Sequence, residues 1–131
     1  MQSPRRCAAV LAFGASAGLA LAADFDGSKP FLCSTIEAND CASGMACVRG
    51  LPQDLNVPQF VKVDFDGRTI SARGRTSPIQ SASRSNGMLV IQGTENRRAY
   101  SITVAESTGK LVGAIAGDDE AFVVFGACTL L

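Results

Sequence analysis

Apolar and polar side chains alternate through much of the chain after residue 59. In FVKVDF, residues 60–65, every second residue from Val61 onward is apolar, and the pair Asp66-Gly67 follows directly. Strict alternation is typical of a half-buried β-strand, and Asp-Gly between two alternating runs indicates a β-hairpin. A two-residue turn here would set Val63 opposite Ile70, so that the apolar residues of both strands lie on one face.

A second hairpin is predicted in the C-terminal half of the chain. A turn at residues 108–109 would join two alternating runs. With a two-residue turn, Ile102 would lie opposite Ile115 and Val104 opposite Gly113. The apolar positions of both strands then again fall on one face.

The next turn is predicted at residues 118–119, and it leads into the strongly apolar run AFVVFGAC. This turn would set Phe122 opposite Ile115 and Val124 opposite Gly113. Three successive strands therefore agree on one inner face.

Seven segments have the pattern of strands, and tight turns such as Asn86-Gly87 separate them. The segments are residues 31–38, 60–65, 68–72, 88–92, 100–104, 110–116 and 121–128. No segment sustains the apolar stripe of a helix. The sequence therefore predicts an all-β domain, a small antiparallel meander or barrel-like curled sheet of about seven strands.

Residues 38–58 do not fit this pattern, because they contain Pro52 and Pro58 and mostly polar residues near them. Proline removes a hydrogen-bond donor from a strand and restricts the residue before it. We expect an irregular segment here, lying over Val123 and Phe125, the outward-facing apolar residues of the last strand.

The first 22 residues have the pattern of a secretory signal peptide. Arg5 and Arg6 precede an uncharged apolar run over residues 8–22, which ends in the small-residue motif Ala-Leu-Ala. The run is shorter than the roughly 20 residues of a membrane-spanning helix. We expect cleavage after Ala22, leaving a single domain over residues 23–131 that is periplasmic or secreted.

The charge of the remaining chain is slightly negative. Of 12 Lys and Arg residues two lie in the leader, so the balance against 12 Asp and Glu is 10 − 12 = −2. Neither nucleic acid nor, after signal cleavage, a membrane is expected as a partner.

Four cysteines remain after the leader is removed: Cys33, Cys41, Cys47 and Cys128. In an oxidising compartment an even number of cysteines indicates disulfides. The spacing lacks the close pairs of a zinc site, and the chain has no histidine, so neither a metal nor another cofactor is expected. A thiol enzyme would also need a base to form its thiolate.

Three disulfide pairings are possible, and the strand pattern favours one of them. Cys33 and Cys128 fall on the inner face if the first and last strands pair antiparallel, so we predict that they are joined. Cys41 and Cys47 would then close a short ring. A bond between Cys47 and Cys128 is the alternative.

Basic residues cluster near the ends of two predicted hairpins. Arg73 and Arg75 follow the first hairpin, whereas Arg97 and Arg98 precede the strand that begins with Tyr100. If these ends are neighbours, the five residues form a surface able to bind a carboxylate or phosphate. The alternative is that the arginines are simply solvated at strand ends.

These observations favour a binding or inhibitor-type module over an enzyme. The absence of histidine excludes a Ser-His-Asp triad and removes the usual base near neutral pH. The alternative is a hydrolase acting on envelope material through carboxylates such as Asp118 and Glu120. The expected partner is an envelope protein or a small ligand.

The chain also resembles a group of small exported proteins of proteobacteria. The residues that carry the resemblance are ADFDGSKPFLCSTIEANDC, LP…PQF, RTSPI, QGTE, YSITV…TGKL and the closing FVVFGACT. The resemblance covers nearly all of residues 23–131. It implies export and a single domain, and it carries over no catalytic residue.

Overall fold

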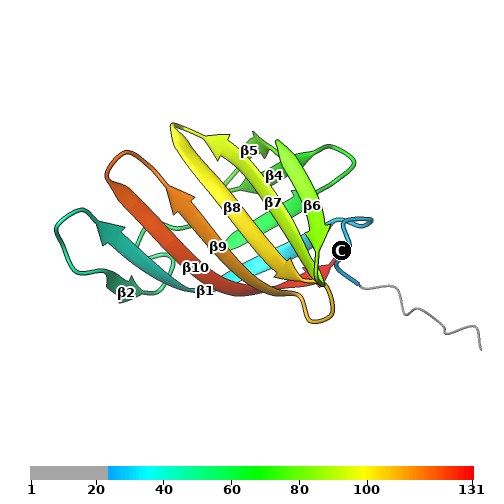
Figure 1. Ribbon diagram of the computed structural model, residues 1–131, viewed down its shortest axis with the longest axis horizontal. Helices are drawn as coiled ribbons and strands as arrows, with labels where there is room; N and C mark the ends of the chain where they lie inside the picture. The colour runs from blue at the N-terminus through cyan, green and yellow to red at the C-terminus, as the bar shows by residue number, and fades with distance from the viewer. Residues whose placement is uncertain (1–23) are drawn as a thin grey trace, which may run out of the picture.

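Ten β-strands form one antiparallel sheet in the computed structural model of the chain, which describes residues 24–131 (Figure 1). They are β1 (Phe31–Ala42), β2 (Val48–Gly50), β3 (Phe60–Asp64), β4 (Thr69–Ala72), β5 (Arg75–Pro78), β6 (Ser81–Ser85), β7 (Met88–Glu95), β8 (Arg98–Ala105), β9 (Lys110–Ala116) and β10 (Glu120–Leu130). The expected signal peptide, residues 1–22, lies outside the described residues. The predicted all-β class is confirmed, with ten strands in place of about seven.

The sheet curls into a half-barrel. Its strands follow the order β5-β4-β3-β1-β10-β9-β8-β7-β6, and β2 pairs with β1 on the same edge as β3. The end strands β5 and β6 are consecutive in the chain, and only Ile79-Gln80 separates them. The N–H of Ile79 donates to the carbonyl oxygen of Arg68 (2.8 Å), and that of Gln80 donates to the carbonyl oxygen of Gln92 (2.9 Å). This link brings the two edges of the sheet together.

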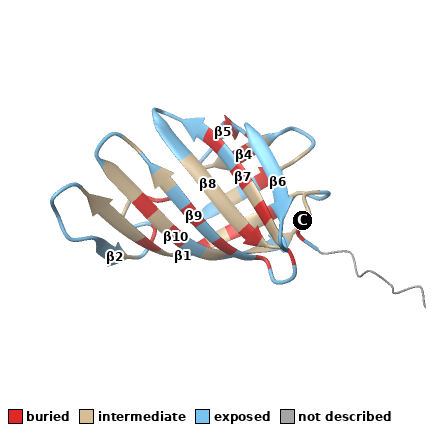
Figure 2. Cartoon of the chain, in the orientation of Figure 1, coloured by how far each residue is buried: buried red, intermediate tan, exposed pale blue. Residues whose placement is uncertain are grey.

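The three strands that the sequence did not predict are β2, β5 and β6. They are short and have no run of alternating apolar residues; every residue of β6, for example, is exposed (Figure 2). Backbone pairing with β1, β4 and β7 holds them in place. Their conformation is set by these neighbours and not by a pattern of their own.

The hairpin between β3 and β4 has the predicted register, with Val63 opposite Ile70. Its turn differs from the predicted two-residue type. The residue with positive φ is Arg68 (φ 50°), whose N–H donates to the carbonyl oxygen of Phe65 at 3.1 Å. Asp66-Gly67 therefore forms the turn without the positive φ that we expected there.

The predicted register of the hairpin between β8 and β9 is wrong by two residues. Ile102 lies opposite Gly113, and Val104 lies opposite Leu111. The turn is centred on residues 107–108, one residue before the predicted centre at residues 108–109. Because side chains alternate with a period of two, the shift leaves the same residues on the inner face.

The hairpin between β9 and β10 has the register predicted from a turn at residues 118–119. Phe122 lies opposite Ile115, and Val124 lies opposite Gly113. A Cβ atom added at Gly113 would lie 2.7 Å from Cγ2 of Val124. Glycine at this position therefore gives Val124 its space on the inner face.

Both disulfides have the predicted pairing, Cys33–Cys128 and Cys41–Cys47. Strands β1 and β10 pair antiparallel with Cys33 directly opposite Cys128, and Cys33 is fully buried. This bond joins the central strand pair of the sheet. The second bond closes a loop between β1 and β2.

The prediction of an irregular segment over residues 38–58 is wrong in part, because some of these residues form strands. Ala38–Ala42 continues β1, because β10 extends far enough to pair with it, and Val48–Gly50 forms β2. The parts of the segment without strands are residues 43–47 and the loop over residues 51–58. This loop packs Val57 against the inner core and not against the outer face. Phe125 consequently stays 41 % exposed, and Val123 is half-buried.

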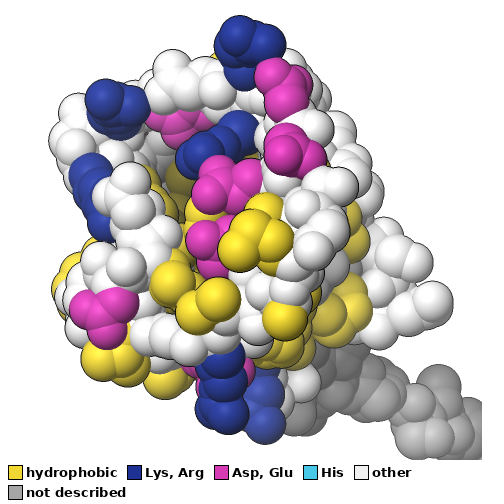
Figure 3. Space-filling view, turned by 90° about the vertical axis from the view of Figure 1, so that its left-hand side faces the viewer, with side chains coloured by type: hydrophobic (Ala, Val, Ile, Leu, Met, Phe, Trp, Pro, Cys, Tyr) yellow, Lys and Arg dark blue, Asp and Glu magenta, His cyan; other side chains and the backbone are white. Residues whose placement is uncertain are grey.

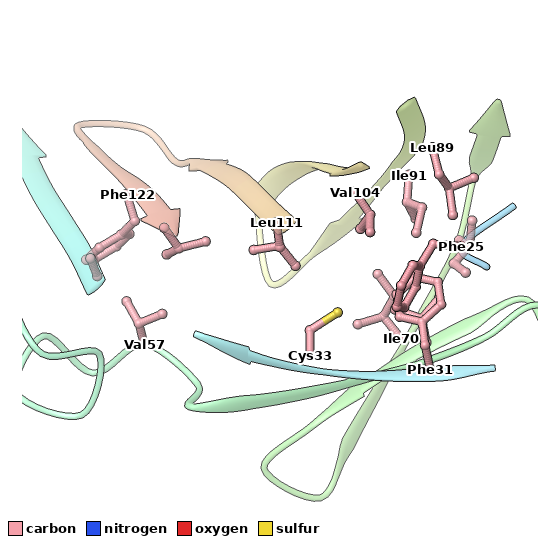
Figure 4. Packing of buried hydrophobic residues seen from close by; sticks show 14 residues of the cluster. Phe25, Phe31, Cys33, Val57, Ile70, Leu89, Ile91, Val104, Leu111 and Phe122 are labelled. Atoms are coloured by element: carbon pink, nitrogen blue, oxygen red, sulfur yellow. The ribbon is translucent and has the colours of Figure 1, made fainter. Parts of the chain in front are cut away.

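The core fills one end of the half-barrel more completely than the other. Phe25, just before β1, packs edge-on against Phe31 with ring centroids 5.8 Å apart, and Phe31 contacts Phe65 at 5.6 Å. Leu89 and Ile91 from β7 lie beside this aromatic cluster (Figure 4). The opposite end, toward the turns that follow β4, β7 and β9, is filled only in part, by Val57 and Phe122, and a cavity remains there (Figure 4).

Candidate functional site

The open end of the half-barrel contains a cavity of about 580 Å³, which we call the cup. Figure 3 looks at the molecule from this side, where charged side chains surround a hollow. The cup is lined by Thr35, Asn56, Val57, Pro58, Val61, Ile70, Ala72, Arg73, Arg75, Ser77, Glu95, Asn96, Arg98, Tyr100, Ile102 and Ile115. These residues come from β1, β3, β4, β5, β7, β8 and β9, from the 51–58 loop and from the turns that follow β4 and β7.

The interior of the cup is mainly apolar. Val61, Ile70, Ile102 and Ile115 point inward because each occupies an inner-facing position of its strand. Val61, Ile102 and Ile115 are only half-buried, although they belong to the side of the sheet that forms the core. An apolar surface left open in this way favours contact with an apolar ligand.

One wall of the cup carries polar groups. Ser77 is only 4 % exposed and lines the cup, yet its hydroxyl makes no hydrogen bond to another residue of the described chain. The Tyr100 hydroxyl donates to the carbonyl oxygen of Pro78 at 2.8 Å. Gly93 lies opposite Tyr100, where any Cβ atom would collide with the tyrosine hydroxyl. This glycine makes room for the tyrosine in the wall.

The surroundings of Tyr100 keep its phenol neutral. Burial raises the pKa of Tyr100 above its ordinary value, and the negative charge of Glu95 adds to this effect. The hydroxyl is therefore a neutral hydrogen-bonding group of the cup near pH 7 and not a base.

Arg73 and Arg75 stand at the rim, on the hairpin between β4 and β5. Arg73 and Gly74 both have positive φ (51° and 72°), which makes a tight two-residue turn. The guanidinium of Arg73 donates to both oxygens of Asn56 (2.7 and 3.2 Å) and to the carbonyl oxygen of Val57 (3.0 Å). These bonds tie the hairpin tip to the 51–58 loop across the mouth.

Arg98 lies at the rim on the opposite side, at the start of β8. Its guanidinium donates to Glu120 at 2.6 Å and lies over the Phe122 ring, 5.6 Å from the centroid. Arg75 and Glu95, in contrast, form no ion pair with any residue of the described chain. The rim thus has one arginine neutralised by a carboxylate and two that are not.

Four of the five residues predicted as a contact surface line the cup, namely Arg73, Arg75, Arg98 and Tyr100. Arg97 does not line it and instead pairs with Asp118 at 2.8 Å, with both side chains highly exposed. The role of these residues in binding stays a prediction. Their proximity follows from the curl of the sheet.

The carboxylates considered for hydrolysis do not face each other across a cleft. Asp118 pairs with Arg97, whereas Glu120 pairs with Arg98. No group of three or more His, Cys, Asp and Glu residues that could hold a metal ion occurs within residues 24–131. The same stretch contains no helix long and apolar enough to cross a membrane.

The sequence reasoning missed the apolar part of the site. It assigned Val61, Ile70, Ile102 and Ile115 to the inner face, and an apolar pattern there is the same for core residues and for the lining of a cavity. Thr35 and Ser77 are the buried hydroxyl residues of the lining that depart from an ordinary core pattern, and Ser77 lies on a strand that was not predicted. Without that strand, its position could not be recognised.

No protein-family model, curated protein or solved structure matches the chain. The geometry of the cup is therefore the basis on which a function can be argued.

Proposed function

We propose that the protein is an exported, non-enzymatic binding module that takes a small, mainly apolar ligand into the cup. The observation that carries this proposal is the open apolar end of a half-barrel whose other end is packed with aromatic side chains. A periplasmic or secreted location is part of the proposal. The two disulfides and the pattern of residues 1–22 support it.

The size and shape of the cup favour a small molecule over a protein partner. Cavities of about 300–1,000 Å³ are typical of sites that enclose small ligands, and 580 Å³ lies within this range. A concave apolar interior with a few polar groups at defined positions is the usual composition of such sites. A protein partner would instead need a broader exposed surface.

Binding without catalysis agrees with the chemistry of the cup. Its lining contains one carboxylate, Glu95, and no thiol or histidine. Asp118 and Glu120, the residues of the alternative hydrolase, are each held by an arginine outside the apolar interior. Among the residues that line the cup, no acid and base face a common point.

A neutral fluorescent probe tests the proposal. Phenylnaphthylamine is uncharged and becomes brighter in apolar surroundings, so we expect it to bind the purified oxidised protein. Ala72→Phe fills the cup from its wall and should abolish the signal. Phe125→Ala, on the convex face, is the matched control and should leave it unchanged. Equal signals from wild type and Ala72→Phe would refute the proposed function.

A further inference from the structure

We propose that the ligand is an amphiphile with a single anionic head group, bound by Arg75 at the rim while its apolar body lies in the cup. This inference rests on the proposed function and adds the chemical class of the ligand.

The charges at the mouth leave an excess of one positive charge. Arg98 is neutralised by Glu120, which leaves Arg73 and Arg75 against Glu95, or 2 − 1 = +1. A ligand with one negative charge completes this balance. A neutral ligand would leave Arg75 facing only water, and a cationic ligand would be repelled.

Arg75 is the cation free to receive the head group. Both terminal nitrogens of Arg73 already donate to the oxygens of Asn56 and Val57. Arg75 makes no hydrogen bond or ion pair through its side chain within residues 24–131, although it lines the cup. Its planar guanidinium can donate two parallel hydrogen bonds to a carboxylate or similar anion.

Ser77 supplies a second contact just inside the rim. Arg75 and Ser77 are two residues apart on β5, so both side chains lie on the face that lines the cup. Ser77 lies opposite Ile70, where the apolar interior begins. An anion held by Arg75 can also accept a hydrogen bond from the Ser77 hydroxyl, and the rest of the ligand then continues along Ile70 and Val61.

The interior favours an apolar body over a sugar or peptide. Apart from Ser77, the groups beyond the rim that could hydrogen-bond are Thr35 and Tyr100, and both already donate to backbone carbonyl oxygens. A polar ligand would lose its hydrogen bonds to water here without regaining them. An alkyl or aryl chain has no such cost.

Two probes that differ in charge test the proposal. Anilinonaphthalene sulfonate has the aromatic body of phenylnaphthylamine plus one anionic group. We expect Arg75→Gln to weaken binding of the sulfonate by about three- to tenfold, the range expected for a charged hydrogen bond at a partly exposed site. The same variant should leave binding of the neutral probe within about twofold, because Arg75 contributes little to apolar contact.

Arg97→Gln is the matched control, since it removes the same charge outside the cup. It should change binding of either probe by less than about twofold, because exposed charges are screened. Glu95→Gln should strengthen binding of the sulfonate. If Arg75→Gln affects both probes equally, or neither, the anionic head group is refuted while the cup remains a binding site. If the neutral probe fails to bind wild type, the proposed function itself is refuted.

Discussion

Gly93 shows at the scale of one residue how the cup keeps its shape. A Cβ atom there would meet the Tyr100 hydroxyl and would lie 2.7 Å from the carbonyl oxygen of Pro78. The glycine therefore permits the hydrogen bond between Tyr100 and Pro78, which joins β8 to the end of β5. The bond thus holds the phenol ring in the wall of the cup.

We predict that Gly93→Ala destabilises the protein by about 1–3 kcal/mol, through steric conflict and loss of this hydrogen bond. Urea unfolding of the oxidised protein measures the change. Gly67→Ala is the control, because a Cβ atom there meets its nearest neighbour at an ordinary 3.5 Å. It should change the free energy of unfolding by less than about 0.5 kcal/mol. Equal effects of the two substitutions would contradict the account of Gly93.

Arg84 and Glu106 form a residue pair at the end of the barrel opposite the cup. Nε and Nη2 of Arg84 donate to the two carboxylate oxygens of Glu106 at 2.6 and 3.0 Å, and Glu106 is 7 % exposed. These hydrogen bonds lower the pKa of Glu106 below its ordinary value, against the opposing effect of burial. A lowered folded-state pKa stabilises the protein above the unfolded-state pKa of about 4.3.

We therefore predict that this part of the stability is lost as the pH falls below about 4, through the folded-state pKa of Glu106. Urea midpoints measured between about pH 7 and about pH 3 should fall less steeply in Arg84→Gln than in wild type. Arg97→Gln, which breaks an exposed pair, should follow the wild-type pH dependence. Parallel curves for Arg84→Gln and wild type would contradict the assignment.

At the scale of the elements, the pairing of β1 with β10 organises the sheet. These two strands lie at the centre of the strand order, and the Cys33–Cys128 bond joins them across 95 residues. The Cys41–Cys47 bond spans only 6 residues. A disulfide that closes a longer loop restricts the unfolded chain more.

We predict that Cys33→Ala/Cys128→Ala costs about 4–5 kcal/mol of stability and Cys41→Ala/Cys47→Ala about 2 kcal/mol, from the chain entropy of the two loops. Thermal or urea unfolding of both double variants measures the difference. Each double variant keeps the other disulfide, so the two stabilities can be compared directly with each other. A greater loss from the short ring would mean that strain or packing, and not loop length, decides the stability.

The strands could be predicted where the sequence alternates, and not elsewhere. Val63 opposite Ile70 and Val124 opposite Gly113 follow from short turns with recognisable residues. The hairpin between β8 and β9 was misplaced because its turn is centred on residues 107–108, one residue before the predicted centre at residues 108–109. Strands β5 and β6 are polar, and only their backbone pairing with neighbours defines them.

At the scale of the whole molecule, the position of the cup follows from an unequal distribution of large side chains. Phe25, Phe31 and Phe65 fill one end of the half-barrel. At the other end most inward residues are aliphatic, apart from Tyr100 and Phe122, and the strands end in charged turns that surround an opening (Figure 3). The basic residues of this site could be predicted from their places at strand ends. The cavity could not, because it depends on how far the sheet curls.

The most direct test of the cup is a titration of the isotopically labelled oxidised protein with decanoate, an apolar chain with one anionic head, followed by backbone amide NMR. The account predicts that the shifted signals belong to the cup, at Ile70, Ser77 and Ile102, while Val112 and Phe125 on the convex face keep theirs. Shifts centred on Val112 and Phe125, or no shifts with decanoate in large excess, would contradict it.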